Sequence, residues 1–333
     1  MLNALINQLK GNARIKKIIY VIGFLIGLAI LIFLIYDVGI GSVYGAILSA
    51  NIYYVILAFL ILTLVLFLGG LNIVLFAICL GHKRRPFEII STYILNWVVS
   101  QVVPIRISSL SLLLLLKKSK IKIKDGVAII LVDKIITLTA LLALTAIGLF
   151  YFFPTNSVIK YPILFVILLL FITVLTLSAR SERFLLSMLN SLKISSFVAN
   201  NLEGFSLASK KIMRYKRLII FNTLITFVKL LITALITYTI FLGFGAKANV
   251  FEFLLISIVV SALASLPITN AGLGVRELSA VVLYAQLMGI DRTVIASTYL
   301  IFLFLKYVFS IVFLIIYSLV KFTNGISKRM FSY

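Results

Sequence analysis

Seven ionisable side chains lie within long apolar segments of the sequence, where charged groups are rare. Near the centre of a bilayer, each costs on the order of 3 kcal/mol or more unless it is paired or hydrated. The set comprises five cations and two carboxylates: Arg106, Asp133, Lys134, Lys229, Arg276, Glu277 and Lys306. If each carboxylate neutralises one cation, three positive charges still lack an internal partner. This excess indicates a hydrated site for an anion such as phosphate, which arginine binds bidentately. Structural ion pairs that fix helix register are the alternative.

A break in an apolar run, between residues 264 and 277, is the second feature with chemical meaning. Proline blocks helix continuation there, and two glycines permit positive φ. The apolar flanks, 249–266 and 278–290, are too short for comfortable separate crossings, which need roughly 17 to 25 residues. Two half-helices that meet in a re-entrant hairpin are therefore favoured over a short loop outside the membrane. The break adds to the candidate site Pro267, Asn270, Gly272 and Gly274.

A second interrupted segment runs from Glu88 to Leu116 and carries Pro104 and Arg106 near its middle. Basic residues flank both of its ends. Because basic loops stay in the cytoplasm, this segment is expected to enter the membrane and return without crossing it, with Pro104 and Arg106 at the tip. At the end of the second flank, lysines alternate with isoleucines from Lys120 to Lys124, and we expect this stretch to lie on anionic headgroups rather than to form a strand.

Six apolar segments are long enough to cross a bilayer once each. Their approximate bounds are 18–36, 53–81, 127–152, 161–177, 218–244 and 293–320. Of the 31 lysines and arginines, only Lys160, Lys247 and Arg292 fall on the predicted outer side, and five lie within apolar segments. The positive-inside rule therefore places both termini in the cytoplasm.

The predicted fold is all-α: a polytopic membrane helix bundle that forms one domain over residues 1–333. A long span, a hairpin and a span with buried charge occur in this order in 53–152 and again in 218–320, and the two hairpins enter from opposite sides. This is the pattern of an inverted repeat, which in transporters places the site where the halves meet. A basic tail, 1–17, and a basic connection, 180–217, complete the chain, and we expect an amphipathic surface helix in the connection.

Composition excludes several classes of protein. The chain of 333 residues is 63% hydrophobic and 12% charged, with a mean hydropathy of +1.22, which excludes a soluble globular domain. The net charge of +22 follows from the cytoplasmic loops and does not indicate nucleic acid. One cysteine, Cys79, and one histidine, His82, exclude a disulfide framework, a Cys/His metal cluster and a histidine-based triad. We therefore expect no enzyme activity, no cofactor and no metal.

Short motifs in both halves resemble a known family, the transmembrane domain of the lysylphosphatidylglycerol synthases, also described as flippase-like. In the second half, the matching residues are Pro267, Gly272-Leu273-Gly274, Glu277, Gly289 and a basic residue in the last span. In the first half, Pro104 and the Asp133-Lys134 step are similar to the family's proline break and its acidic-basic pair. The resemblance covers about residues 15 to 320.

The chain departs from the family pattern at three places. After the first proline it reads Ile107-Ser108-Ser109-Leu110, where the family usually has Gly-Glu. Asp133-Lys134 replaces the commoner Glu-Arg, and Lys306 stands for an arginine.

The resemblance implies translocation of a phospholipid or a lipid-linked sugar. Family members that synthesise aminoacylated lipid carry a large cytosolic transferase domain, whereas this chain stops about a dozen residues past its last span. We therefore expect a flippase-like protein of the cytoplasmic membrane, whose partners are lipids with anionic headgroups. Three alternatives remain open: a non-catalytic partner of a lipid-modifying enzyme, a transporter of a small soluble anion, and a membrane-embedded transferase that uses Asp133 or Glu277 as a base.

Overall fold

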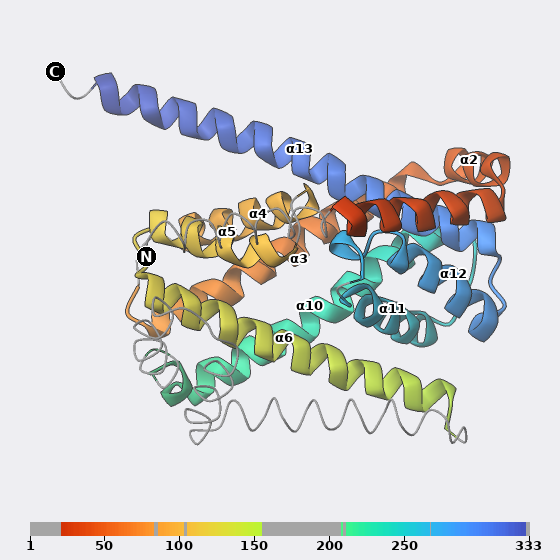
Figure 1. Cartoon of the computed structure of the whole chain (residues 1–333), viewed down its shortest axis with the longest axis horizontal. Coiled ribbons are helices and arrows are strands. Elements are labelled where there is room, and N and C mark those ends of the chain that lie inside the picture. The colour runs from red at the N-terminus through yellow and green to blue at the C-terminus, as the bar shows by residue number, and fades with distance from the viewer. Residues whose placement is uncertain are drawn as a thin grey trace, which may run out of the picture.

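The computed structural model describes residues 21–82, 86–102, 105–154, 208, 211–266 and 268–330, without the side chains of 102–110 and 321–330. These residues form an all-α bundle, and none of them lies in a strand (Figure 1). The expected fold class, an all-α membrane helix bundle, is confirmed. The predicted crossing at 161–177, the tail 1–17 and most of the basic connection 180–217 lie outside the described residues.

Five of the helices are long and apolar enough to cross a membrane. They are the N-terminal helix Val21–Val38, α3 (Ile52–Cys79), α6 (Ile123–Phe152), α10 (Lys216–Leu242) and α13 (Arg292–Met330), of which the apolar part ends at Val320. Each coincides with one of the six predicted crossings to within a few residues. This agreement arises because 18 or more apolar residues in a row leave the backbone few alternatives to a spanning helix.

Two pairs of shorter helices form hairpins at the predicted breaks. The first pair is α4 (Pro86–Val102) with α5 (Ile105–Lys118), and the second is α11 (Val250–Ala264) with α12 (Val275–Met288). The four helices contain 14 to 17 residues, so each is about 21 to 26 Å long, which is less than the roughly 30 Å of a bilayer's hydrocarbon core.

Polar contacts show that the two hairpins enter the bundle from opposite ends. At one end, where α3 ends and α6 begins, His82 Nε2 lies 2.9 Å from Asp125 Oδ2. At the other end, Tyr151 Oη, at the end of α6, donates to Glu252 Oε1 in the first turn of α11 at 3.0 Å. The succession of long helix, hairpin and long helix thus occurs twice, as α3 to α6 and as α10 to α13, with the hairpins at opposite ends (Figure 1).

One local expectation was wrong. Between the predicted spans 18–36 and 53–81 the sequence predicts only a loop, but this stretch contains the helix α2 (Ile40–Ser49), which begins after Gly39 at φ 100° and buries Val43. The ten residues of α2 are too few to form a stable helix alone, so this helix depends on packing against the rest of the bundle.

In the basic flank 117–124, all five lysines are exposed and no residue lies in a strand. Ile121 is 3% exposed and α6 begins at Ile123. Contact of these lysines with anionic headgroups stays a prediction.

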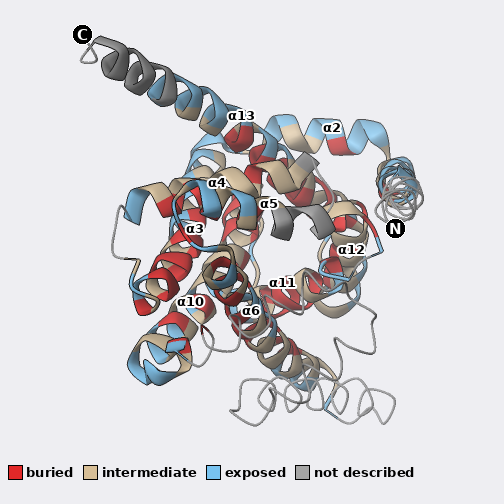
Figure 2. Cartoon of the chain, turned by 60° about the vertical axis from the view of Figure 1, so that its left-hand side comes forward, coloured by how far each residue is buried: buried red, intermediate tan, exposed pale blue. Residues whose placement is uncertain are grey.

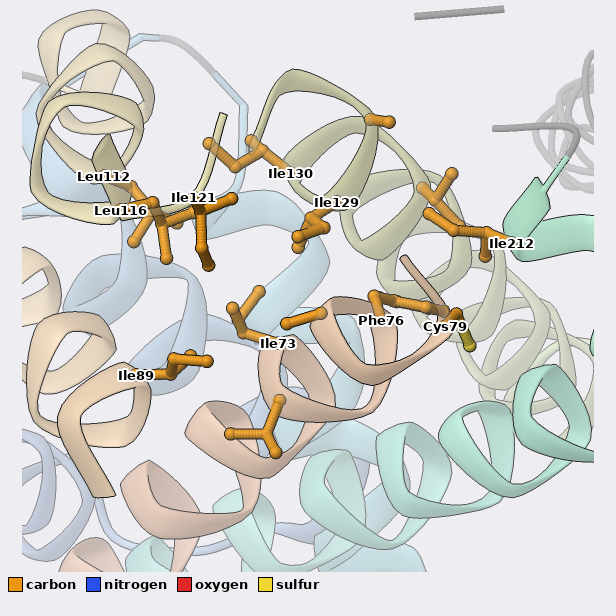
Figure 3. Close-up of a cluster of buried hydrophobic side chains, with 14 of the residues drawn as sticks. Ile73, Phe76, Cys79, Ile89, Leu112, Leu116, Ile121, Ile129, Ile130 and Ile212 are labelled. Atoms are coloured by element: carbon orange, nitrogen blue, oxygen red, sulfur yellow. The ribbon is translucent and has the colours of Figure 1, made fainter. Parts of the chain in front are cut away.

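The bundle is held together by apolar clusters and by close approach of glycines. One cluster joins α3, α4, α5 and α6 through Ile73, Ile89, Leu116 and Ile129 (Figure 3). A Cβ at Gly70 of α3 would lie 2.9 Å from Ile90 Cγ2 of α4, so only glycine allows this approach. Large apolar side chains also cover much of the outer surface, while the buried residues line the interior of the bundle (Figure 2). An apolar exterior of this kind suits lipid rather than water.

Candidate functional site

The break between α11 and α12 is a tight, irregular turn. Ala271 has φ 53° and Gly272 has φ 74°, inside a 3-10 turn at Asn270–Gly272. A Cβ at Gly272 would lie 2.6 Å from the carbonyl oxygen of Ala264, so the returning chain touches the end of α11. Thr269 is 4% exposed, and its hydroxyl has no hydrogen-bond partner among the described residues. The expected helix break is therefore present, although Pro267 itself lies outside the described residues.

Glu277 binds the backbone at the start of α12. The backbone N–H of Gly274, at φ 75°, donates to Glu277 Oε2 at 2.8 Å, and Glu277 is 1% exposed. A carboxylate in this place satisfies a free donor at the helix N-terminus and interacts favourably with the helix dipole. From the sequence, Glu277 is expected to neutralise a cation, but its direct partner is a backbone amide.

Two cations approach the same aromatic ring next to this turn. The centroid of the Phe302 ring lies 5.9 Å from Arg276 Cζ and 5.2 Å from Lys306 Nζ. Lys306, one helical turn after Phe302 on α13, is only 6% exposed and is subject to the charges of both Arg276 and Glu277. In the described part of the chain, neither cation forms a salt bridge. The site therefore holds two cations beside one carboxylate that is already hydrogen-bonded.

A chain of buried hydroxyl groups lies behind this turn. Thr237 of α10 is 2.8 Å from Ser257 of α11, and Ser257 is 3.1 Å from the hydroxyl of Tyr299 on α13. Tyr299 is also subject to the charge of Arg276. These hydroxyls connect α10, α11 and α13. They are not predictable from the sequence, because single serines and threonines in apolar helices are common.

The N-terminal helix packs directly on the turn. A Cβ at Gly27 would lie 2.8 Å from the carbonyl oxygen of Leu273, and one at Gly23 would lie 3.5 Å from Asn270 Oδ1. Conversely, a Cβ at Gly274 would collide with the carbonyl oxygen of Gly27. The four-residue spacing of Gly23 and Gly27 is the small-residue motif of close helix packing in membranes. The two glycines are thus a packing signal that is visible in the sequence, although none of the predicted site residues lies on this helix.

Asp133, Lys134 and Lys229 form a second group of charges, which involves α4, α6 and α10. Asp133 is subject to the charges of Lys229 and Lys134, and Tyr93 is subject to those of Asp133 and Lys229. Asp133 Oδ1 is buried and has no hydrogen-bond partner among the described residues. Lys134 is exposed on the surface of α6. Lys229 of the second half is thus near enough to Asp133 of the first half for their charges to interact, so this group joins the two halves and is distinct from the cations at the α11–α12 turn.

A polar contact between α3 and α10 lies one helical turn from Lys229. Asn72 Nδ2 donates to Thr226 Oγ1 at 2.9 Å, and Asn222 Nδ2 donates to the carbonyl oxygen of Asn72 at 3.2 Å. All three residues are fully buried. Buried amides of this kind fix the register of two helices, because a shifted pairing would leave them unsatisfied.

Two candidate residues of the first hairpin receive no side-chain description. Pro104 lies between α4 and α5 outside the described residues, and Arg106 lies in the first turn of α5. Their place in a site stays a prediction. The depth of Lys229 and Lys306 within their spans also predicts an interior cavity that both lysines share with Arg276 and Glu277, and this too stays a prediction.

The fold and the charges define a polytopic α-helical membrane protein with two broken-helix hairpins, one of which lies next to a buried lysine and carries a half-buried arginine. The chain belongs to the family of the lysylphosphatidylglycerol synthase TM region, whose family model matches residues 20–313. No curated protein and no solved structure shows significant similarity to it. Membership in this family indicates a membrane protein of lipid metabolism or transport.

Proposed function

We propose that this protein moves an anionic phospholipid or a lipid-linked precursor across the cytoplasmic membrane, and that it does so without covalent chemistry. One observation carries the proposal: Arg276 and the buried Lys306 converge on Phe302, while the neighbouring carboxylate is bound to the Gly274 amide. Two adjacent cations in an apolar setting repel each other and gain from an added anion. The phosphate of a lipid headgroup supplies that anion.

Both hairpins are proposed to be re-entrant, with their turns inside the membrane and both termini in the cytoplasm. The short α11 and α12 support this, because half-helices that meet at depth free backbone donors near the midplane. The N-terminus of α12 then points toward the headgroup and adds its dipole to the two side-chain cations. Because Glu277 remains on Gly274, it lowers the net charge of the empty site without occupying the place of the phosphate.

Arginine and lysine have separate roles in this proposal. Arg276 can bind two phosphate oxygens at once, whereas Lys306 contributes a point charge on a flexible stem. The Phe302 ring holds both cations in place when no anion is bound, through cation–π interactions. The headgroup would bind by replacing these contacts, so the charges would remain compensated as it passes.

The experiment is a headgroup-accessibility assay in proteoliposomes with fluorescent phosphatidylglycerol, phosphatidic acid and phosphatidylcholine. The expected result is faster exposure of the anionic lipids than of phosphatidylcholine, and a loss of this difference in Arg276→Gln and in Lys306→Gln. Lys247→Gln, an exposed lysine outside the site, is the matched control. Uptake of radiolabelled inorganic phosphate by the same vesicles, without lipid movement, would favour the soluble-anion alternative. Vesicles that move neither would leave the role of a non-catalytic partner and overturn the proposal.

A further inference from the structure

An open groove of about 630 Å³ lies between α4 and α5 of the first hairpin. Its lining combines apolar residues of both helices with one hydroxyl and two lysines: Leu95, Val99, Ser111, Leu114, Leu115, Lys117 and Lys118. The volume is within the range of small-molecule sites, which is roughly 300 to 1,000 Å³. This groove is separate from the turn of the second hairpin, and no function has been assigned to it above.

The lining is polarised along the hairpin. Leu95 and Val99 are one turn apart on α4, and Ser111, Leu114 and Lys118 follow one face of α5 at helical spacing. At its inner part, the Ser111 hydroxyl donates to Asn96 Oδ1 and ties the two helices together. At the other end, where α5 terminates, stand both lysines. The groove is therefore apolar along its length and positively charged at the end of the hairpin.

The two lysines are available for an anionic ligand. Both are exposed, and within the residues that the structure describes neither forms a salt bridge. Leu114 is 61% exposed, so the groove is open to the outside of the bundle. The inference drawn from this groove rests on the re-entrant hairpin of the proposed function, in which that side meets lipid. A ligand that enters from that side must itself be apolar over most of its length and carry its negative charge at one end. An anionic phospholipid has this chemistry.

We infer that the α4–α5 groove is a binding site for an anionic phospholipid, with one acyl chain along Leu95, Val99 and Leu114 and the phosphate at Lys117 and Lys118. This site goes beyond the proposed translocation, because it requires only equilibrium binding of lipid from the membrane. The ordinary alternative is that both lysines merely neutralise the carbonyl end of α5. That alternative predicts no selectivity for lipid charge and no dependence on the shape of the groove.

The test uses tryptophan fluorescence, since Trp97 is the only tryptophan of the chain. Trp97→Phe removes the native signal while keeping an aromatic ring against Phe309, and Leu114→Trp then places the single reporter at the groove. The full-length variant is reconstituted into phosphatidylcholine vesicles, in which an increasing fraction of lipid is replaced by phosphatidylglycerol with brominated acyl chains. A parallel series uses brominated phosphatidylcholine. Bromine quenches only when the acyl chain is adjacent to the reporter.

The expected result is an apparent affinity at least about threefold higher for phosphatidylglycerol than for phosphatidylcholine, in line with the attraction of single lysines to anionic lipid. Lys117→Gln with Lys118→Gln should bring this ratio close to one. The control, Lys216→Gln with Arg217→Gln, removes the same charge from exposed positions at the start of α10 and should leave the ratio unchanged.

A third variant tests the groove itself. Val99→Phe fills part of its lining and should weaken quenching by phosphatidylglycerol although both lysines remain. Equal quenching by the two lipids in the parent, or a full charge preference in the double lysine variant, would overturn the inference. Unchanged quenching in Val99→Phe would mean that the lysines attract lipid whether or not the groove is open. That result would also overturn the inference. Because no transport is measured, these outcomes are independent of the translocation assay.

Discussion

The contact between the N-terminal helix and the α11–α12 turn can be tested with one methyl group. In Gly27→Ala, the new Cβ would lie 2.8 Å from Leu273 O and 3.3 Å from both Leu273 Cβ and Thr269 Cβ. Carbon–oxygen contacts are normally at about 3.3 Å or more, so the helix and the turn must separate by about half an ångström. Overpacking of this size costs typically 1 to 3 kcal/mol.

Gly27→Ala also has a stabilising effect on its helix, which can be measured separately from the overpacking at other glycines of the chain. Alanine is better than glycine in a helix by roughly 0.5 to 1 kcal/mol. Gly23→Ala should show mainly this gain, because its nearest neighbour would be at 3.5 Å, an ordinary contact. Gly45→Ala on α2 meets nothing within 4 Å and is the matched control. The net effect expected for Gly27→Ala is a loss of about 1 to 2 kcal/mol.

The assay is reversible unfolding of the purified protein in mixed detergent micelles, followed by circular dichroism. The expected order of unfolding free energy places Gly27→Ala below the parent, and both Gly23→Ala and Gly45→Ala at or above it. A Gly27→Ala protein as stable as Gly23→Ala would refute the reasoning, because the two glycines would then have equivalent surroundings and the helix would not lie against the turn.

Three further variants address other contacts. Glu277→Ala removes the acceptor for the Gly274 amide and should lower the free energy of unfolding by about 1 to 3 kcal/mol, whereas Glu277→Gln keeps an acceptor oxygen and should lose less; the same micelle titration measures both. Phe302→Leu removes both cation–π contacts and should lower the melting temperature more at low phosphatidylglycerol content than at high content, where lipid compensates the cations; an equal decrease would contradict this. Asn72→Leu removes the amide that donates to the buried Thr226 hydroxyl and should lower the free energy of unfolding by about 1 to 3 kcal/mol. Because α3 and α10 would then be held together less tightly, limited proteolysis of the variant should be faster than that of the parent.

The spanning helices were predictable because the bilayer reduces the choice of backbone structure to one form. Bounds of α3 and α10 agree with the sequence within a few residues, since loops of polar and basic composition end each apolar run. The hairpins were predictable for a different reason. A proline inside an apolar segment breaks the helix, and basic residues on both sides of the first break require its ends to lie on one side of the membrane.

The contacts between helices were less predictable. Helical periodicity shows which face of a helix is buried, but it does not show which other helix packs against that face. The spacing of Gly23 and Gly27 indicates close packing, but nothing in it selects the turn at Leu273 rather than another helix. In the same way, a lysine inside a span requires a partner without naming it. Lys229 is near enough to Asp133 of the other half for their charges to interact, while Lys306 and Arg276 approach the same ring of Phe302.

The central claim is that Arg276 and Lys306, at the α11–α12 turn, bind the anionic headgroup of a lipid while it crosses the membrane. The most direct measurement is a ratio of two initial rates in proteoliposomes: the rate at which phosphatidylglycerol becomes exposed on the opposite leaflet, divided by the same rate for phosphatidylcholine. This ratio is compared between the parent and the double variant Arg276→Gln, Lys306→Gln. Charge-assisted hydrogen bonds contribute about 1.5 to 3 kcal/mol, so the ratio should fall by about tenfold or more. A double variant that is folded and keeps the parent's ratio would contradict the claim.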